Sequence, residues 1–213
     1  TLWQRDLSLS HERIGDVRRA EGDLAGALAA YAAGLVIRER LAVADPRNTL
    51  WQRDLSLSHE RIGDVRMAEG DLKGALAAYA AGLAIAERLA AADPRNTLWQ
   101  RDLAVSWERL ATVRERQGDT LAALAAWRRA LAVSEPLAAA FPDNVDLRAT
   151  PVVHLAGIAR GVRGAGAGGR AEARRCLQRA LDLLIPLAAG GKLDTARAGW
   201  VAWIRGELAA LDE

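Results

Sequence analysis

Hydrophobic side chains recur along this chain with the spacing of an α-helix, and two such stretches follow each other in residues 49–93. The apolar face of the first stretch consists of Trp51, Leu55, Ile62 and Val65. The apolar face of the second consists of Leu72, Ala75, Leu76, Tyr79, Gly82, Leu83 and Leu89. Steps of three and four residues place such side chains on one side of a helix, so the pattern predicts two helices of about 20 residues each.

Both predicted helices carry end signals. Thr49 and Gln52 have the spacing of a capping box, in which a threonine hydroxyl and a glutamine side chain satisfy free amides at a helix start. Gly70 is expected to end the first helix and Asp71 to cap the second. Pro94 ends the second helix because proline has no amide hydrogen to donate. Helices joined by so short a turn lie antiparallel, and one such hairpin cannot bury its apolar face alone, so we expect successive hairpins to stack.

The hairpin pattern repeats with a period of 48 residues. Residues 1–48 and 49–96 differ only at Arg19/Met67, Ala25/Lys73, Val36/Ala84, Arg38/Ala86 and Val43/Ala91. The third stretch, 97–144, keeps just over half of these letters, and a fourth stretch, 145–192, is degenerate. The fourth has gained two residues relative to the third, most simply in the glycine-rich run 164–169, which we interpret as a loosened turn.

The C-terminal part departs from the repeat in two further ways. Pro136 and Pro186 both fall inside predicted second helices, and each is expected to kink its helix or end it early. Residues 194–211 are predicted to form one terminal helix. Its apolar side chains are expected to cover the end of the stack, and they are Trp200, Trp203, Ile204, Leu208 and Leu211.

The order of small and large residues in each stretch resembles the tetratricopeptide repeat. The second stretch carries Ile62-Gly63, Gly70-Asp71, Ala75, Tyr79 and Gly82-Leu83. The equivalents elsewhere are Ile14-Gly15, Gly22-Asp23, Ala27, Tyr31 and Gly34-Leu35 in the first stretch, and Leu110-Ala111, Gly118-Asp119, Ala123, Trp127 and Ala130-Leu131 in the third. Units of this family usually have 34 residues, so the helices here are extended. The resemblance implies an all-α fold: a right-handed solenoid of helical hairpins, with units 1–48, 49–96, 97–144 and 145–192, closed by a C-terminal capping helix in 193–213.

The resemblance also implies a binding surface. Members of this family grip a protein or peptide segment on a concave face lined by the first helix of each unit. The corresponding residues here are Leu9, Glu12, Asp16, Arg19, Leu57, Glu60, Asp64, Met67, Val105, Glu108, Thr112 and Glu115. Some members hold a C-terminal carboxylate through Lys and Asn side chains on this face, but acidic residues stand at those places here, so we expect no such clamp.

Stacking would align Glu12, Glu60 and Glu108 into an acidic row, which would favour a basic partner segment. The alternative is an ordinary solvated helix face whose carboxylates are neutralised by neighbouring arginines, namely Arg13, Arg61 and Arg109. Trp3, Trp51 and Trp99 occupy one position in three units, and we expect them to pack between helices. These tryptophans belong to a seven-residue sequence, TLWQRDL, that occurs at residues 1–7, 49–55 and 97–103. Its arginines (5, 53 and 101) and aspartates (6, 54 and 102) are expected to stay in water.

Composition and charge narrow the choice of partners. The chain has 29 basic and 27 acidic residues, a net charge of +2, so nothing favours nucleic acid or an anionic membrane. No run of 18 uncharged apolar residues occurs, and we expect no membrane partner. The single cysteine, Cys176, excludes an internal disulfide and fits a reducing compartment, so a cytoplasmic location is expected.

No set of residues indicates catalysis, a metal or a cofactor. His11 and His59 lie one repeat apart, too far for a shared metal ion, and His154 stands alone. Cys176 sits on the core side of an alanine-rich helix and is expected to be buried and inert. The glycines of 164–169 lack the Gly-Lys-Ser/Thr ending of a phosphate loop.

We therefore expect a non-enzymatic scaffold that binds a partner protein or peptide on its concave face. An alternative is homotypic assembly, in which arrays stack head-to-tail through their ends, because the first two units are nearly identical. The chain starts inside a repeated phrase and lacks an initial methionine, so we also expect it to be a fragment of a larger bacterial protein.

Overall fold

The computed structural model describes residues 2–211, and these form α-helices joined by short turns, with no strand among them. Helices that follow each other in the chain pack as neighbours within two compact units, Thr1–Gln117 and Gly118–Glu213. The predicted all-α solenoid of helical hairpins is therefore confirmed. The division at Gln117 falls inside the third 48-residue stretch, and the assignment of four equal repeat units stays a prediction.

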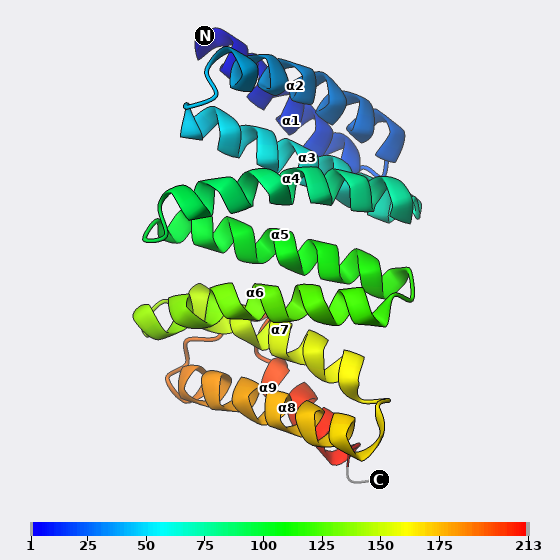
Figure 1. The fold of residues 1–213 in the computed structure, drawn as a ribbon, viewed down its shortest axis with the longest axis vertical. Coiled ribbons are helices and arrows are strands. Elements are labelled where there is room, and N and C mark those ends of the chain that lie inside the picture. Colours follow the sequence, from blue (N-terminus) through cyan, green and yellow to red (C-terminus); the bar gives the residue numbers. More distant parts are fainter. Residues whose placement is uncertain (1, 212–213) are drawn as a thin grey trace. The chain divides into compact units, whose positions relative to one another are not determined.

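Unit 1 contains five helices: α1 (Leu2–Ala20), α2 (Leu24–Ala44), α3 (Thr49–Glu69), α4 (Leu72–Ala92) and α5 (Thr97–Arg116). Figure 1 shows them running antiparallel, each beside the next in the chain. Within each hairpin the turn is set by a glycine and an aspartate. Gly70 adopts a left-handed conformation (φ 82°) that ends α3, and the Asp71 carboxylate accepts a hydrogen bond from the Gly74 amide to start α4. Both predicted end signals are confirmed.

The start of α3 differs from the predicted capping box. The cap is Asn48, whose side-chain oxygen accepts a hydrogen bond from the Trp51 amide, and Thr49 is already the first helical residue. The Gln52 side chain donates instead to the carbonyl oxygen of Ala42, at the end of the preceding helix. Asn96 and Gln100 repeat this arrangement at the start of α5. The glutamine therefore joins successive units and does not close a local box.

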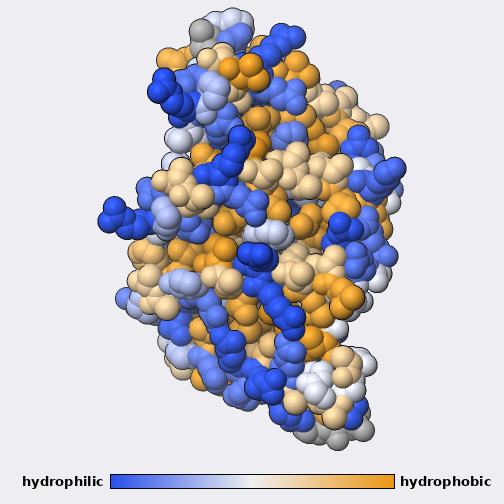
Figure 2. Space-filling view, in the orientation of Figure 1, coloured by the Kyte–Doolittle hydropathy of each residue, from blue (hydrophilic) through white to orange (hydrophobic). Residues whose placement is uncertain are grey.

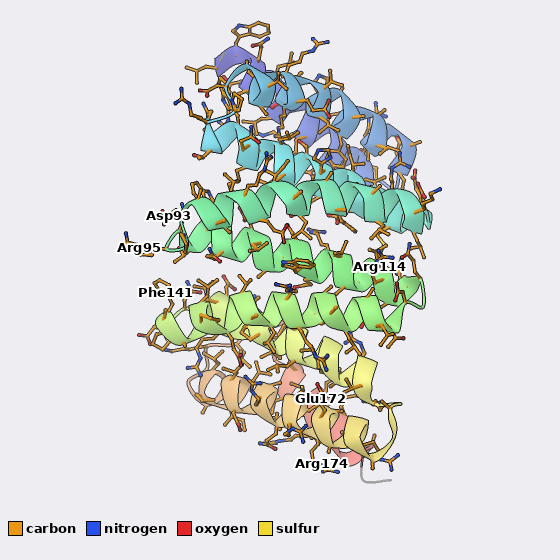
Figure 3. All side chains as sticks on the ribbon, in the orientation of Figure 1. Asp93, Arg95, Arg114, Phe141, Glu172 and Arg174 are labelled. Atoms are coloured by element: carbon orange, nitrogen blue, oxygen red, sulfur yellow. The ribbon has the colours of Figure 1, made fainter. Side chains whose placement is uncertain are left out.

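Within unit 1, the turns that connect one hairpin to the next share one hydrogen-bonding pattern. In the turn between α4 and α5, the Asp93 carboxylate accepts a hydrogen bond from the Arg95 amide at 3.0 Å, and both residues lie at the edge of unit 1 in Figure 3. Asp45 and Arg47 make the same bond in the turn between α2 and α3. An aspartate that bonds the backbone two residues on stabilises such a turn locally, so each connection needs only four residues.

The core of unit 1 is built from small residues facing tyrosine rings. Tyr31 packs in a cluster with Ala27, Ile62 and Val65, and Tyr79 packs with Ala75 and Val113. A Cβ atom added to Gly63 would lie 2.4 Å from the Tyr79 ring. This glycine lies inside α3 and is required for close approach of a ring, not for an unusual backbone conformation.

Unit 2 contains α6 (Thr120–Ala140), α7 (Val145–Val162), α8 (Gly166–Ala189) and α9 (Trp200–Ala209). Trp127 takes the place of the tyrosines, and its ring packs where a Cβ on Gly157 would stand, 2.4 Å away. The Ser134 hydroxyl and the His154 ring nitrogen Nδ1 lie 2.9 Å apart, and both side chains are buried. His154 is thus part of a hydrogen-bonded core.

Three predictions for unit 2 need correction or refinement. Pro136 and Pro186 lie inside α6 and α8 and do not end them, because both helices continue beyond the proline. The loosened turn is confined to 163–165, and the later glycines belong to the first turn of α8. The terminal helix starts at Trp200, later than predicted, and packs against α8 with Ile204 fully buried, while Trp203 is exposed.

One helix in residues 2–211, α4, is long and apolar enough to cross a membrane by length and composition alone. In unit 1 it lies between α3 and α5 and buries Ala75, Tyr79 and Leu83 against them. The core helix of a water-soluble repeat has the same composition, so this property is weak evidence for a membrane span.

Candidate interaction surface

Within unit 1, the arginine of one TLWQRDL sequence forms an ion pair with the aspartate of the next one along the chain. Arg5 of α1 donates to the Asp54 carboxylate of α3 at 2.6 Å, and Arg53 of α3 donates to Asp102 of α5 at 2.5 Å. Asp54 is buried. The expectation that these side chains stay in water was therefore wrong for the paired positions. In each pair the arginine donates to the aspartate of the following TLWQRDL sequence, so Asp54 accepts from the preceding sequence while Arg53 donates to the following one.

A second set of arginines neutralises the predicted acidic row. Arg61 of α3 lies 3.5 Å from the Glu12 carboxylate and 3.6 Å from that of Asp16, both on α1. One repeat later, Arg109 of α5 pairs with Glu60 and Asp64 of α3. The arginine thus stands between two carboxylates of the preceding unit. Arginines neutralise these four carboxylates, as the alternative expected, but Glu60 is buried, so this part of the face is not the ordinary solvated surface that the alternative described.

Arg38 is a buried arginine that the sequence analysis did not single out. It lies on α2, and its guanidinium donates to the Ser58 hydroxyl at 2.7 Å and to the Asp54 carbonyl oxygen at 3.0 Å. It also pairs with the Glu12 carboxylate. The side chain therefore ties three helices together. Position 38 is one of the five at which the first two units differ, and that difference was the available signal.

The second repeat, residues 49–96, has no arginine at the position of Arg38. Ala86 stands where the first unit has Arg38, and it is buried in α4. Glu60, the counterpart of Glu12, is itself buried, and its carboxylate accepts a hydrogen bond from the Ser106 hydroxyl at 2.7 Å. The guanidinium of Arg109 lies 3.3 Å away. Burial raises the pKa of Glu60, and the Ser106 hydrogen bond and the Arg109 charge do not fully offset it.

The raised pKa predicts a pH-dependent effect of Glu60→Gln. Because the folded chain holds the proton on Glu60 more tightly than the unfolded chain, Glu60 contributes stability that is fully present below its unfolded pKa of about 4.3. This contribution is lost as the pH rises through the folded-state value. We expect the free energy of unfolding of the native chain, minus that of Glu60→Gln, to increase as the pH falls from 7 toward 4. Urea unfolding of both proteins at each pH measures it, and a difference that stays constant or has the opposite slope contradicts it.

The two core tyrosines extend the charge network. The Tyr31 hydroxyl donates to the Asp16 carboxylate at 2.6 Å, and the Tyr79 hydroxyl donates to Asp64 at 2.9 Å. Burial, strengthened by the neighbouring carboxylate, raises the pKa of Tyr31 to about 12 and also raises the pKa of Tyr79. Each of these carboxylates is therefore held by a tyrosine of its own hairpin and by an arginine of the next unit.

The other predicted surface residues are placed as follows. Arg19 is exposed and lies 3.7 Å from the Asp64 carboxylate. The Thr112 hydroxyl donates to the Glu108 carbonyl oxygen within α5. Glu60 is buried and Arg19 is exposed, and the other predicted residues are half-buried: Leu9, Glu12, Asp16, Leu57, Asp64, Met67, Val105, Glu108, Thr112 and Glu115. Figure 2 shows hydrophilic side chains beside hydrophobic ones across the visible face of this unit. Contact of any of these residues with a partner stays a prediction.

The remaining candidates behave less uniformly. Trp51 and Trp99 are half-buried, but Trp3 is exposed, so the expectation that all three pack between helices was wrong for the first. Cys176 is buried as predicted, and burial raises the pKa of its thiol, which keeps it protonated. Among residues 2–211, no three histidine, cysteine or carboxylate side chains gather as ligands for a metal ion.

Comparison with known proteins defines a class of fold. No protein-family model matches the chain, and no curated protein matches it. Among solved structures, BtubC (BKLC) from P. vanneervenii matches with a TM-score of 0.73 and 16% identity, covering 98% of this chain and 74% of that one. The MamA protein matches with a TM-score of 0.39 and 17% identity, covering 89% and 97%. The BtubC likeness shows the fold, an all-α helical repeat, and the hairpins fit a tetratricopeptide-like arrangement. Membership of that family stays a prediction.

Proposed function

We propose that unit 1 is part of a non-catalytic scaffold that binds a segment of a partner protein along its first helices, α1, α3 and α5. The observation that supports the proposal is the run of antiparallel hairpins in unit 1, in which each helix packs against the next one in the chain. Proteins of this architecture are generally protein-interaction scaffolds. Ion pairs between units, such as Arg5 with Asp54, support the idea of a pre-ordered surface that loses little entropy on binding.

The charge distribution limits the chemistry of the proposed segment. A basic segment would have to displace Arg61 and Arg109 from the carboxylates that they already pair with. We therefore place the main contacts on the half-buried apolar residues that recur at one position per unit, Leu9, Leu57 and Val105, and on Met67. The guanidinium groups of Arg61 and Arg109 remain about one-third exposed and can add contacts to an acidic or carbonyl-rich edge of the segment.

Site-specific photo-crosslinking in the cells that naturally make this protein tests the proposal. A photoreactive amino acid is placed at Leu57 or Met67 on α3, and at the exposed Ala80 on α4 as the matched control. We expect both first-helix positions to crosslink to the same segment of one partner, identified by mass spectrometry, with no such adduct at Ala80. Adducts at Ala80 alone, or unrelated proteins at Leu57 and Met67, would show that the first-helix surface is not the binding face.

A further inference from the structure

A groove in unit 1 lies between the turn that joins α2 to α3 and the C-terminal half of α4. It has a volume of about 280 Å³. Its apolar lining consists of Pro46 in the turn and of Ile85, Leu89 and Ala92 on α4. The first-helix residues assigned above to partner binding are not among the described residues that line it. The groove is therefore a surface distinct from the one proposed above.

The spacing of residues on α4 explains the shape of the groove. Ile85, Arg88, Leu89 and Ala92 follow one another at steps of three, one and three residues, which places them on one face of the helix. Ile85 and Leu89 are buried, whereas Ala92 and Pro46 are exposed. The groove therefore has a floor that is continuous with the core and edges that are open to water. Since a cavity of about 150 Å³ already holds a benzene ring, one large apolar side chain fits here.

The charged residues that line the groove are two arginines, Arg47 from the turn and Arg88 from α4. Both are exposed, and neither side chain forms an ion pair with any residue of 2–211. In this they differ from Arg53, whose guanidinium pairs with a carboxylate of α5. The backbone amide of Arg47 donates to the Asp45 carboxylate at 3.1 Å, which fixes the point at which the side chain leaves the turn.

No carboxylate is among the described residues that line the groove. The lining therefore carries two positive charges and no negative one, although the chain as a whole is nearly neutral. An occupant that complements this lining has an apolar group for the floor and negative charges for the two guanidinium groups. A segment rich in aspartate or glutamate around one apolar residue has this chemistry, and a basic segment does not.

We propose that this groove binds a short segment of a partner protein in which carboxylates flank one large apolar residue. The apolar side chain packs over Ile85 and Leu89, and the carboxylates pair with Arg47 and Arg88. Burial of the apolar side chain supplies most of the affinity, because exposed ion pairs contribute little. The two arginines select an acidic segment over a basic one. This site does not depend on the first-helix surface.

Peptide selection tests the groove. A phage-displayed library of short random peptides is selected on the native chain and counter-selected on a variant that carries both Arg47→Glu and Arg88→Glu. We expect the surviving peptides to share one large apolar residue with aspartate or glutamate on both sides. The peptide that is most enriched is then synthesised with a fluorescent label, and fluorescence polarisation measures its dissociation constant with each protein.

Arg88→Glu alone is expected to weaken binding of this peptide by at least about 10-fold, because an attractive charge pair becomes a repulsive one. The matched control is Lys73→Glu, which changes the net charge equally. Lys73 is exposed on the same helix and does not line the groove, so we expect a change of less than about twofold. Circular dichroism of both variants checks that the fold is kept.

The peptide offers two further tests. Replacing its apolar residue by serine is expected to weaken binding to the native chain by at least about 10-fold, since the floor is then left unfilled. Replacing its acidic residues by lysine is expected to abolish binding to the native chain and to restore binding to the Arg47→Glu, Arg88→Glu variant. Such an exchange of charge preference would support direct pairing with these two arginines.

Three results would overturn the proposal. The first is a selection in which no peptide distinguishes the native chain from the doubly substituted variant. The second is equal weakening of peptide binding by Arg88→Glu and Lys73→Glu, because the effect is then one of net charge. The third is a labelled polyglutamate that binds the native chain as tightly as the selected peptide, because the groove then attracts any polyanion and does not recognise an apolar residue.

Discussion

Replacing Gly63 by valine is expected to lower the free energy of unfolding by about 3 kcal/mol, the upper end of what overpacking of a core costs. A Cβ at this position would stand 2.4 Å from the Tyr79 ring, well inside van der Waals contact. The ring cannot turn away freely, because its hydroxyl donates to the Asp64 carboxylate one residue along α3. The strain therefore falls on the packing of α3 against α4. Urea unfolding followed by circular dichroism measures the loss.

The matched control is Gly206→Val in α9. Gly206 is also a helical glycine, but a Cβ there meets nothing within 4 Å. Valine and glycine have similarly low helix propensities, so we expect a change of less than about 0.5 kcal/mol. Equal losses at both positions would mean that glycine is needed for backbone reasons, and the proposed role of the tyrosine ring would be rejected.

Asp54→Ala is expected to destabilise the chain by about 2 kcal/mol, within the range for losing a hydrogen-bonded charge partner. Asp54 is buried and accepts two hydrogen bonds from Arg5, at 2.6 and 3.4 Å. Removing the carboxylate leaves the Arg5 guanidinium, which is about one-quarter exposed, without its partner in the next unit. The free energy of unfolding from urea titration at pH 7 gives the measurement.

The repeat supplies its own control for this prediction. Asp6 occupies the same position of the same phrase but is exposed and has no ion-pair partner within residues 2–211. Asp6→Ala should therefore change stability by less than about 0.5 kcal/mol. In a double-mutant cycle, Arg5→Ala should cost clearly less when Asp54 is already alanine. Additive losses in that cycle would show that the two side chains do not act as a pair.

The fold of unit 1 was predictable because signals within a few residues of each other determine where its helices begin and end. Apolar residues at helical spacing, Gly70 at a left-handed position and Asp71 as a cap each act within a few residues, and the structure has all three as predicted. A copied sequence also implies copied contacts, so stacking followed from the repetition itself. The predicted capping box does not form, because Asn48 is also a good cap residue and takes the N-cap position in place of Thr49. The Gln52 side chain donates to the carbonyl oxygen of Ala42 in the preceding helix.

The candidate surface was only partly predictable. The twelve residues could be placed on first helices by their spacing, but the partners of their charges could not be read from spacing. Arg61 pairs with Glu12 and Asp16 of the preceding repeat, which lie more than 40 residues away in the sequence. The role of Arg38 was hidden for the same reason, since its partners come from α1 and α3.

The sequence by itself determined the helices of unit 1, the glycine–aspartate turns between them and the stacking of hairpins, because those properties depend on short-range spacing and on repetition. It did not determine the cap of α3 or the start of α9. Tertiary structure alone decided which identical letters are buried and which are free. Asp6 and Asp54 occupy equivalent positions of the 48-residue repeat, as do Val17 and Val65, yet one residue of each pair is exposed and the other is buried. The physical reason is that burial and charge pairing depend on the neighbouring helices, and within residues 2–211 a preceding hairpin packs against α3 and none packs against α1.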